Sequence, residues 1–212
     1  ATDTQTVTIT IKGSNEAKIA PPIVGPGGDY FDTHYLTATS AEATGGDDVL
    51  VGTNSGNDIM GQGGNDKIFG LGGDDTLEGN GGNDELFGGS GKDTITGGGV
   101  DDILIGGFGD DILAGSGGKD TFVYIDFRDT GDTVKDFTVG QDTIAFIGVL
   151  GVTWSNLVIT QDGSDTLVSV DLPGGSAGEY EMQIRLENFD HTTLSESNFN
   201  FNYAATAASL LV

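Results

Sequence analysis

The chain of 212 residues has no cysteine, only 8 lysine and arginine residues, and only 4 prolines. Without cysteine, a disulfide scaffold and thiolate metal sites are both excluded. The 33 acidic residues give a net charge of −25. That balance excludes nucleic acid as a partner, because such binding depends on Lys and Arg that neutralise phosphates. No stretch approaches the roughly 20 apolar residues of a membrane span, so we expect none.

Glycine is abundant, with 37 residues, and aspartate recurs at a fixed spacing. Every ninth position from 48 to 120 is acidic, with one Asn: Asp48, Asn57, Asp66, Asp75, Asp84, Asp93, Asp102, Asp111 and Asp120. An apolar residue follows two places after each: Leu50, Ile59, Ile68, Leu77, Leu86, Ile95, Leu104, Leu113 and Phe122. A disordered acidic tail has no such register. A strict period indicates a solenoid of stacked turns.

In a nine-residue frame the units begin at 43, 52, 61, 70, 79, 88, 97, 106 and 115. The first six residues of a unit are glycine-rich and predict a tight turn. The last three predict a minimal strand whose middle side chain points inward. Two units make an 18-residue coil, so alternate units stack. The acids then form a first column, Asp48, Asp66, Asp84, Asp102 and Asp120, and a second column, Asn57, Asp75, Asp93 and Asp111.

Stacked strands lie about 4.8 Å apart, so consecutive carboxylates in a column repel one another unless cations lie between them. Carboxylates and turn carbonyls are oxygen ligands of the kind that Ca²⁺ prefers, six to eight at a time. The repeat contains neither Cys nor His, which disfavours zinc and copper. Magnesium requires a more rigid octahedral geometry. The sequence therefore predicts a calcium scaffold.

The pattern G-G-x-G-x-D-x-U-x, with U a large apolar residue, resembles the RTX nonapeptide of the bacterial repeats-in-toxin family. The resemblance implies an all-β fold, a right-handed parallel β-roll, with one Ca²⁺ between stacked turns. The earlier turn of each pair would contribute its Asp and the carbonyls of frame positions 2 and 4. The later turn would contribute its Asp and the carbonyls of positions 1 and 3. Adjacent pairs give four sites in the first column and three in the second, about seven in all.

The carbonyl ligands that the resemblance implies come from the turns of each column. In the first column they belong to Thr44, Gly46, Gly61, Gln62, Gly63, Gly64, Gly79, Asn80, Gly81, Gly82, Gly97, Gly98, Gly99, Val100, Gly115 and Gly117. In the second column they belong to Thr53, Ser55, Gly70, Leu71, Gly72, Gly73, Gly88, Gly89, Ser90, Gly91, Gly106 and Phe108. At Asn57 we expect a bulged or weaker site. Val100 is the doubtful substitution, because β-branched residues avoid positive φ.

The regions outside the repeat differ in composition. We expect an end strand of an upstream immunoglobulin- or cadherin-like adhesin repeat at 1–12, a linker or N-terminal cap at 13–42, the roll at 43–123, a short-stranded β cap at 124–203, and a type I secretion signal at 204–212. In the cap, Asp132, Asp136 and Asp142 either bind one more calcium or serve plain turns. Trp154, Phe189, Phe199 and Phe201 are interpreted as cap core.

These features predict a calcium-binding module that is unfolded in the cytosol and folds on extracellular Ca²⁺. The RTX resemblance adds export by the type I secretion machinery and a secreted or bacterial cell-surface location. We expect a monomer at the C-terminal end of a large adhesin. Alternatives are the export and folding module of an extracellular protease or lipase, and an ice- or glycan-binding calcium solenoid. We expect no catalytic site, because neither His34 nor His191 lies in a catalytic motif.

Overall fold

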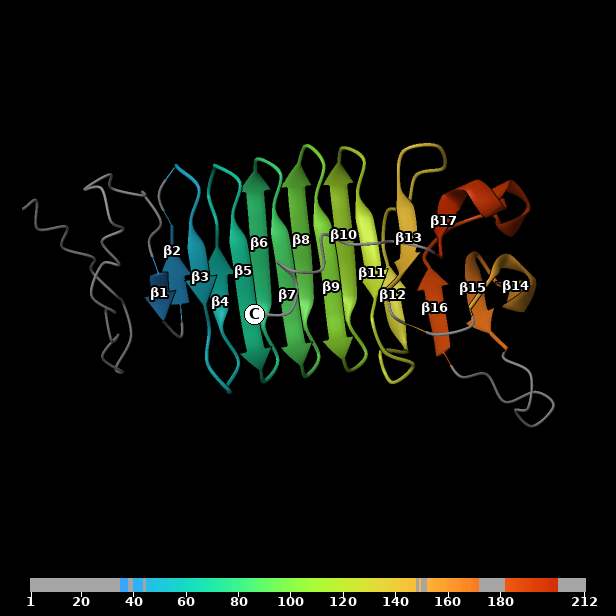
Figure 1. Cartoon of the computed structure of the whole chain (residues 1–212), viewed down its shortest axis with the longest axis horizontal. Helices are drawn as coiled ribbons and strands as arrows, with labels where there is room; N and C mark the ends of the chain where they lie inside the picture. The colour runs from blue at the N-terminus through green and yellow to red at the C-terminus, as the bar shows by residue number, and fades with distance from the viewer. Residues whose placement is uncertain are drawn as a thin grey trace, which may run out of the picture.

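The computed structural model describes residues 35–37, 40–43, 45–147, 149, 152–171 and 182–201. Over these residues the protein is an all-β solenoid in which successive strands from β1 to β13 alternate between two sheets (Figure 1). The first sheet contains, in order, β1 Tyr35–Thr37, β3 Val49–Val51, β5 Lys67–Gly72, β7 Glu85–Ser90, β9 Ile103–Phe108, β11 Thr121–Tyr124, β13 Thr143–Phe146 and β17 Phe199–Asn200.

The second sheet contains, in order, β14 Leu157–Asp162, β15 Asp165–Val170, β16 Met182–Leu186, β12 Asp132–Val134, β10 Ile112–Gly117, β8 Thr94–Gly99, β6 Thr76–Gly81, β4 Asp58–Met60 and β2 Ser40–Glu42. Three short 3-10 turns lie near the C-terminal end, at Trp154–Asn156, His191–Thr193 and Glu196–Asn198. None of the described segments forms a helix of the length and apolarity that crossing a membrane requires.

The register of the parallel strands confirms the 18-residue coil. Ile68 of β5 pairs with Leu86 of β7, and Leu77 of β6 pairs with Ile95 of β8. The inward apolar residue of every unit from Leu50 to Phe122 is fully or almost fully buried. These side chains form one continuous core between the two sheets. The predicted parallel solenoid, with its two alternating sets of units, is therefore confirmed.

The strands of the regular units are longer than predicted. β6 runs from Thr76 to Gly81, so each six-residue strand includes the last three residues of one unit and the first three of the next. The added residues pair through the backbone alone: Asn80 lies opposite Gly98, and Gly81 opposite Gly99. Glycines carry no side-chain pattern that marks a strand, so the three-residue prediction holds only for β3 and β4.

The solenoid extends beyond the repeat at both ends. At the N-terminal side, β1 pairs in parallel with β3, and β2 pairs with β4, so residues 35–37 and 40–42 continue both sheets. At the other side β12 and β13 continue the sheets in parallel. The expected strand at 1–12, residues 13–34 and the expected signal at 204–212 lie outside the described residues.

The cap ends the second sheet with an antiparallel arrangement, in which β15 pairs with both β14 and β16 (Figure 1). Its aromatic residues pack on the core as predicted. The ring of Trp154 lies 5.5 Å from that of Phe199, and the ring of Phe189 lies 5.6 Å from that of Phe137. Phe201 stacks on Phe146 at 5.8 Å. The solenoid is thus closed by a conventional apolar core.

Candidate metal centre

The acidic residues of the repeat lie at the point where each turn enters its strand, and they are buried. Asp66, Asp84 and Asp102 are each only 1% exposed. Within a column, the backbone N–H of each member donates to the Oδ1 of the next. The distances in the first column are 2.7 Å to Asp66, 2.7 Å to Asp84, 2.8 Å to Asp102 and 2.9 Å to Asp120. The N–H groups thus hold the carboxylates in two regular rows.

The second oxygen of most of these carboxylates accepts no hydrogen bond. This group comprises the buried Oδ2 atoms of Asp66, Asp75, Asp84, Asp93, Asp102 and Asp111. A buried ionised oxygen without a donor is costly, and buried charges in proteins are paired or bind metal. Each row therefore contains a set of buried carboxylate oxygens that no protein group donates a hydrogen bond to.

A glycine begins every unit from 52 onward, and the space beside it explains why. A Cβ on Gly79 would collide with Asp84 Oδ2 and lie 2.5 Å from the carbonyl oxygen of Gly97 in the next turn. The same juxtaposition recurs at Gly61, with Asp66 Oδ2 and the carbonyl of Gly79. The unpaired carboxylate oxygen and the position-1 carbonyl of the following turn thus share a cradle that a side chain would fill.

Burial raises the pKa of the column carboxyls from Asp66 to Asp120 in the metal-free fold. Desolvation raises the pKa of Asp66 to about 7, with further contributions from the neighbouring Asp84 and Asp48, although the N–H of Asp48 opposes the shift. It likewise raises the pKa of Asp93 and of Asp102 to about 7. Each shift reflects a cost of ionisation that a bound cation would remove.

This donor set fits Ca²⁺. Carboxylate and carbonyl oxygens are the hard ligands that Ca²⁺ takes, and the chain offers no thiolate. Of the carbonyls implied by the RTX resemblance, those of position 1 lie beside the unpaired oxygens, as at Gly97. Those of positions 2 and 3 accept hydrogen bonds between turns: Gln62 O from Gly81 N at 3.2 Å, and Gly81 O from Gly64 N at 2.9 Å. A carbonyl oxygen has a second lone pair that can still bind a cation, so the assignment of these carbonyls as ligands stays a prediction. Thr44 lies outside the described residues.

The expected bulge at Asn57 is wrong. Asn57 is buried in the row, its N–H donates to Asp75 Oδ1 at 2.7 Å, and β4 pairs with β6 in register. Its side-chain oxygen accepts from the N–H of Thr53 at 2.6 Å. An amide can occupy the carboxylate position because its own N–H donates to the next member as the others do and its side-chain oxygen also accepts a backbone hydrogen bond, but it contributes no charge. A weaker site there stays a prediction.

The turns require positive φ at two frame positions, and only one of these was suspected. Position 4 has Val100 at φ 81° among glycines such as Gly82 at 122°. Position 2 also has positive φ, at Gln62, Leu71, Asn80 and Ser116, with values of 70–79°. Both features follow from the tightness of the turn. Side chains at these positions point to solvent; Val100 is 55% exposed.

Both columns continue into the cap. Asp120 N donates to Asp142 Oδ1 at 3.0 Å, and Asp111 N donates to Asp132 Oδ1 at 2.9 Å. Asp142 is fully engaged, because its Oδ2 accepts from Thr138 N at 2.7 Å. Asp136 instead accepts from the N–H groups of Gly115 and Ser116, at 3.0 and 2.8 Å. The three cap acids of the prediction therefore differ in role, and Asp136 belongs to neither column.

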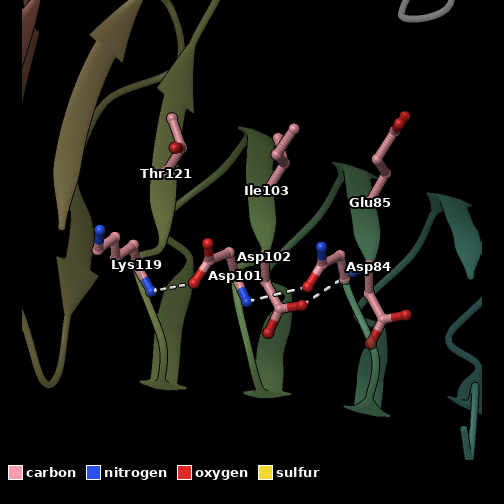
Figure 2. A pocket seen from close by; sticks show the side chains of 8 residues that line it. Asp84, Glu85, Asp101, Asp102, Ile103, Lys119 and Thr121 are labelled. Carbon is pink, nitrogen blue, oxygen red and sulfur yellow. Dashed lines mark hydrogen bonds between the residues drawn. The ribbon is translucent and has the colours of Figure 1, made fainter. Parts of the chain in front are cut away.

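A second, exposed ladder runs beside the first column and was not recognised from the sequence. Frame position 5 holds its members: Asp47, Asn65, Asn83, Asp101 and Lys119. Each backbone N–H donates to the side-chain oxygen of the member one coil earlier, at 2.7–3.2 Å. Figure 2 shows Asp101 and Lys119 in this ladder, with Asp102 and Asp84 of the first column alongside. The doublets Asn-Asp, Asp-Asp and Lys-Asp in the repeat were its signal.

The geometry agrees with what comparisons with known proteins found. The RTX calcium-binding nonapeptide repeat matches four times, over residues 42–77, 60–95, 69–104 and 96–124. No curated protein matched the chain.

Several solved structures match the chain, and two of them illustrate the likeness. One is the extracellular lipase LipA from Serratia marcescens, with 18% identity, TM-score 0.36, and coverage of 79% of this chain and 42% of the lipase. The other is the AlgE6R3 subunit of the Azotobacter vinelandii mannuronan C5-epimerase, with 27% identity, TM-score 0.33, and coverage of 79% and 84%. The chain thus spans less than half of the lipase. The repeat match, over turns that stack with buried aspartates, assigns residues 42–124 of this chain to the RTX calcium-binding repeat family.

Proposed function

We propose that Ca²⁺ ions bind between successive turns of both columns and that the roll is unfolded without them. The observation that carries this proposal is the set of buried Oδ2 atoms in the columns without a hydrogen-bond donor. Six such charges cannot remain ionised in a dry interior without counterions. Each ion adds about 2.7 kcal/mol at a hundredfold excess over its dissociation constant, so several sites together decide whether the roll folds.

The coupling of folding to calcium gives the module a use in export. Extracellular calcium modules bind at roughly 10⁻⁴ to 10⁻³ M, a concentration that the cytosol does not reach. The chain then stays extended inside the cell, passes a type I secretion channel and folds outside it. We propose that it ends a large secreted or surface adhesin, as the pattern at 1–12 and the tail at 204–212 predict.

Calcium titration of the whole chain tests the folding step. Far-ultraviolet circular dichroism reports the strands of the roll, and Trp154, the single tryptophan, reports the cap. We expect the strand signal to rise cooperatively with calcium in the millimolar range, and equal magnesium to leave the roll unfolded. Full strand content in a chelator at neutral pH would overturn the proposal.

A secretion assay tests the export step. The chain is expressed with a type I exporter, with and without residues 204–212, and the medium is assayed for the protein. We expect export only with the tail. As a matched control, Asp84→Asn lowers calcium affinity outside the cell and leaves export intact, because the sites are empty in the cytosol. Equal export of the truncated chain would refute the role of the tail and leave the calcium proposal standing.

A further inference from the structure

The second column ends in a cluster of three carboxylates at the junction of the roll and the cap. After β11 the chain forms a loop over residues 125–131 and returns as β12, which pairs with β10. This loop places Asp129 beside Asp132 of β12 and Asp111 of the roll. Carboxylate oxygens of the three residues all lie within 4.8 Å of one another. The cluster thus contains one acid more than the pair expected at a site of the roll.

All three carboxylates are buried, and most of their oxygens make no hydrogen bond. Asp129 and Asp132 are 0% exposed, and Asp111 is 1% exposed. Asp132 Oδ1 accepts from Asp111 N at 2.9 Å. The Oδ2 atoms of Asp111 and Asp132 and both oxygens of Asp129 accept no hydrogen bond of good geometry, although Asp129 interacts with the Asp132 carboxyl and the Ile125 N–H. Four carboxylate oxygens therefore converge in the interior without a donor of good geometry.

A fourth buried oxygen-bearing group lies within range of the charges of this cluster. Tyr124, at the end of β11, is 0% exposed, and its hydroxyl has no hydrogen-bond partner. Burial raises the pKa of Tyr124 well above its usual range, and the charges of Asp132, Asp129 and Asp111 add to the shift. The phenol therefore lies within the field of all three carboxylates. Buried polar groups without partners require an explanation, such as a bound ion.

The nearby cationic side chains are engaged elsewhere. Lys92 pairs with Asp110 at 2.9 Å and Arg128 pairs with Asp126 at 2.7 Å, and both pairs are largely exposed. A proton shared between Asp129 and Asp132 would neutralise one carboxylate and leave the other charges unpaired. The end of the first column is different, because both oxygens of Asp142 accept backbone hydrogen bonds. The donor deficit is thus specific to the end of the second column.

We propose that Asp111, Asp129 and Asp132 bind a divalent cation, with Ca²⁺ as the ion that this all-oxygen set selects. The site joins the loop over 125–131 to the roll and so couples the docking of β12 to metal. Calcium affinity rises with the number of charged ligands. A site with three carboxylates should therefore bind Ca²⁺ more tightly than the two-carboxylate sites proposed within the roll. This inference rests on the proposed function for one premise, that the protein binds calcium.

Counting bound calcium in the full-length chain tests the site. Asp129→Asn removes one ligand charge; Asp126→Asn removes the same charge from an exposed side chain of the same loop, which pairs with Arg128. By isothermal titration, we expect Asp129→Asn to remove the tightest class of site, because the remaining pair Asp111 and Asp132 binds no more tightly than the two-carboxylate sites of the roll, and Asp126→Asn to retain that class. An unchanged affinity of the tightest class in Asp129→Asn would overturn the site. Absence of any calcium binding in the unchanged chain would instead refute the proposed function.

A terbium measurement keeps the inference falsifiable if Asp129→Asn does not fold. Tb³⁺ replaces Ca²⁺ in oxygen sites and emits when a tyrosine in contact with it is excited. With Tyr124 at the site, we expect Tyr124→Phe to remove most of the tyrosine-sensitised emission of the tightest ion, at unchanged stoichiometry, and Asp126→Asn to preserve it. Undiminished emission from Tyr124→Phe would place the tightest ion elsewhere and overturn the proposal.

Discussion

The roll, residues 45–123, and the described residues of the cap, within 124–201, continue the same two sheets but differ in what lies between them. Each nine-residue unit of the roll contributes one fully buried apolar side chain, such as Leu77 or Leu86, and one buried acidic or amide residue. The cap buries Met182, Ile184 and Leu186 on a single strand and adds aromatic rings. Apolar packing is therefore dense in the cap and minimal in the roll.

The acidic residues of the two regions also differ in the direction of their pKa shifts. Burial raises the pKa of Asp93 and Asp102 in the roll to about 7. In the cap, the N–H of Asn188 and the guanidinium of Arg185 lower the pKa of Asp165. Apart from Asp129 and Asp132 at the junction with the roll, the cap thus supplies donors for carboxylates such as Asp165, whereas the roll leaves its carboxylates to an external cation. The comparison indicates that ions stabilise the roll and packing stabilises the cap.

Acid should fold the calcium-free roll. The roll acids ionise at about 3.8 when unfolded, and Asp66, Asp93 and Asp102 at about 7 when folded. Between these values the folded state binds more protons, so its stability falls as pH rises. We expect calcium-stripped protein to show strand circular dichroism near pH 4.5 and to lose it by about pH 7.

The cap should respond in the opposite direction. The lowered pKa values of Asp165 and Asp190 mean that their contribution is present at neutral pH and lost as pH falls through the folded pKa, below 3.8. Trp154 fluorescence should therefore stay constant while the circular dichroism of the roll changes. An unfolded roll at every pH in the absence of calcium would break the comparison.

The next largest effect on stability is expected from truncating one buried leucine in each region. Leu86 of the roll and Leu186 of the cap are both 0% exposed. Each Leu→Ala change should cost about 2–5 kcal/mol. We expect Leu86→Ala to raise the calcium concentration at the folding midpoint of the roll, because more bound ion offsets the loss by mass action. Leu186→Ala should mainly alter Trp154 fluorescence and thermal unfolding of the cap. Equal shifts of the calcium midpoint in both variants would contradict separate sources of stability.

A smaller effect distinguishes the loss of the space beside Asp84 Oδ2 from a general disturbance of the turn. Gly79→Ala places a Cβ against Asp84 Oδ2 and the Gly97 carbonyl, whereas Gly81→Ala, in the same turn, meets Gln62 O only at 3.7 Å. Neither glycine has positive φ. Gly79→Ala should cost about 1–3 kcal/mol and lose one calcium ion by titration, and Gly81→Ala should retain all. Loss of the ion in both variants would mean that the turn, not the cradle, is sensitive.

The sequence predicts the roll well because its period is carried by side chains. Leu77 and Asp84 recur in a strict register, so the coil length and both columns follow from counting. The six-residue strands do not follow, since backbone pairing of glycines leaves no side-chain pattern. In the cap the columns continue at spacings of 21 to Asp132 and 22 to Asp142. The last member of each column could therefore not be predicted, because the spacing of 18 residues is not kept there. Asp129 could not be predicted either, because it lies in an irregular loop outside any repeat.

The smallest predicted effect tests the β-branched residue that has positive φ among the described turns. Val100 adopts φ 81° at a frame position where the other turns from Gly64 to Gly118 have glycine, and it is 55% exposed. A left-handed conformation costs an L-residue roughly 1–2 kcal/mol, and glycine returns about 0.5–1 kcal/mol of this as unfolded-state entropy. Val100→Gly should thus stabilise the calcium-loaded roll by about 0.5–1 kcal/mol in denaturant titrations. Val139→Gly, an exposed valine of the cap without positive φ, should destabilise, because only the entropic term applies there. Destabilisation by both changes would show that the turn at Val100 is not strained.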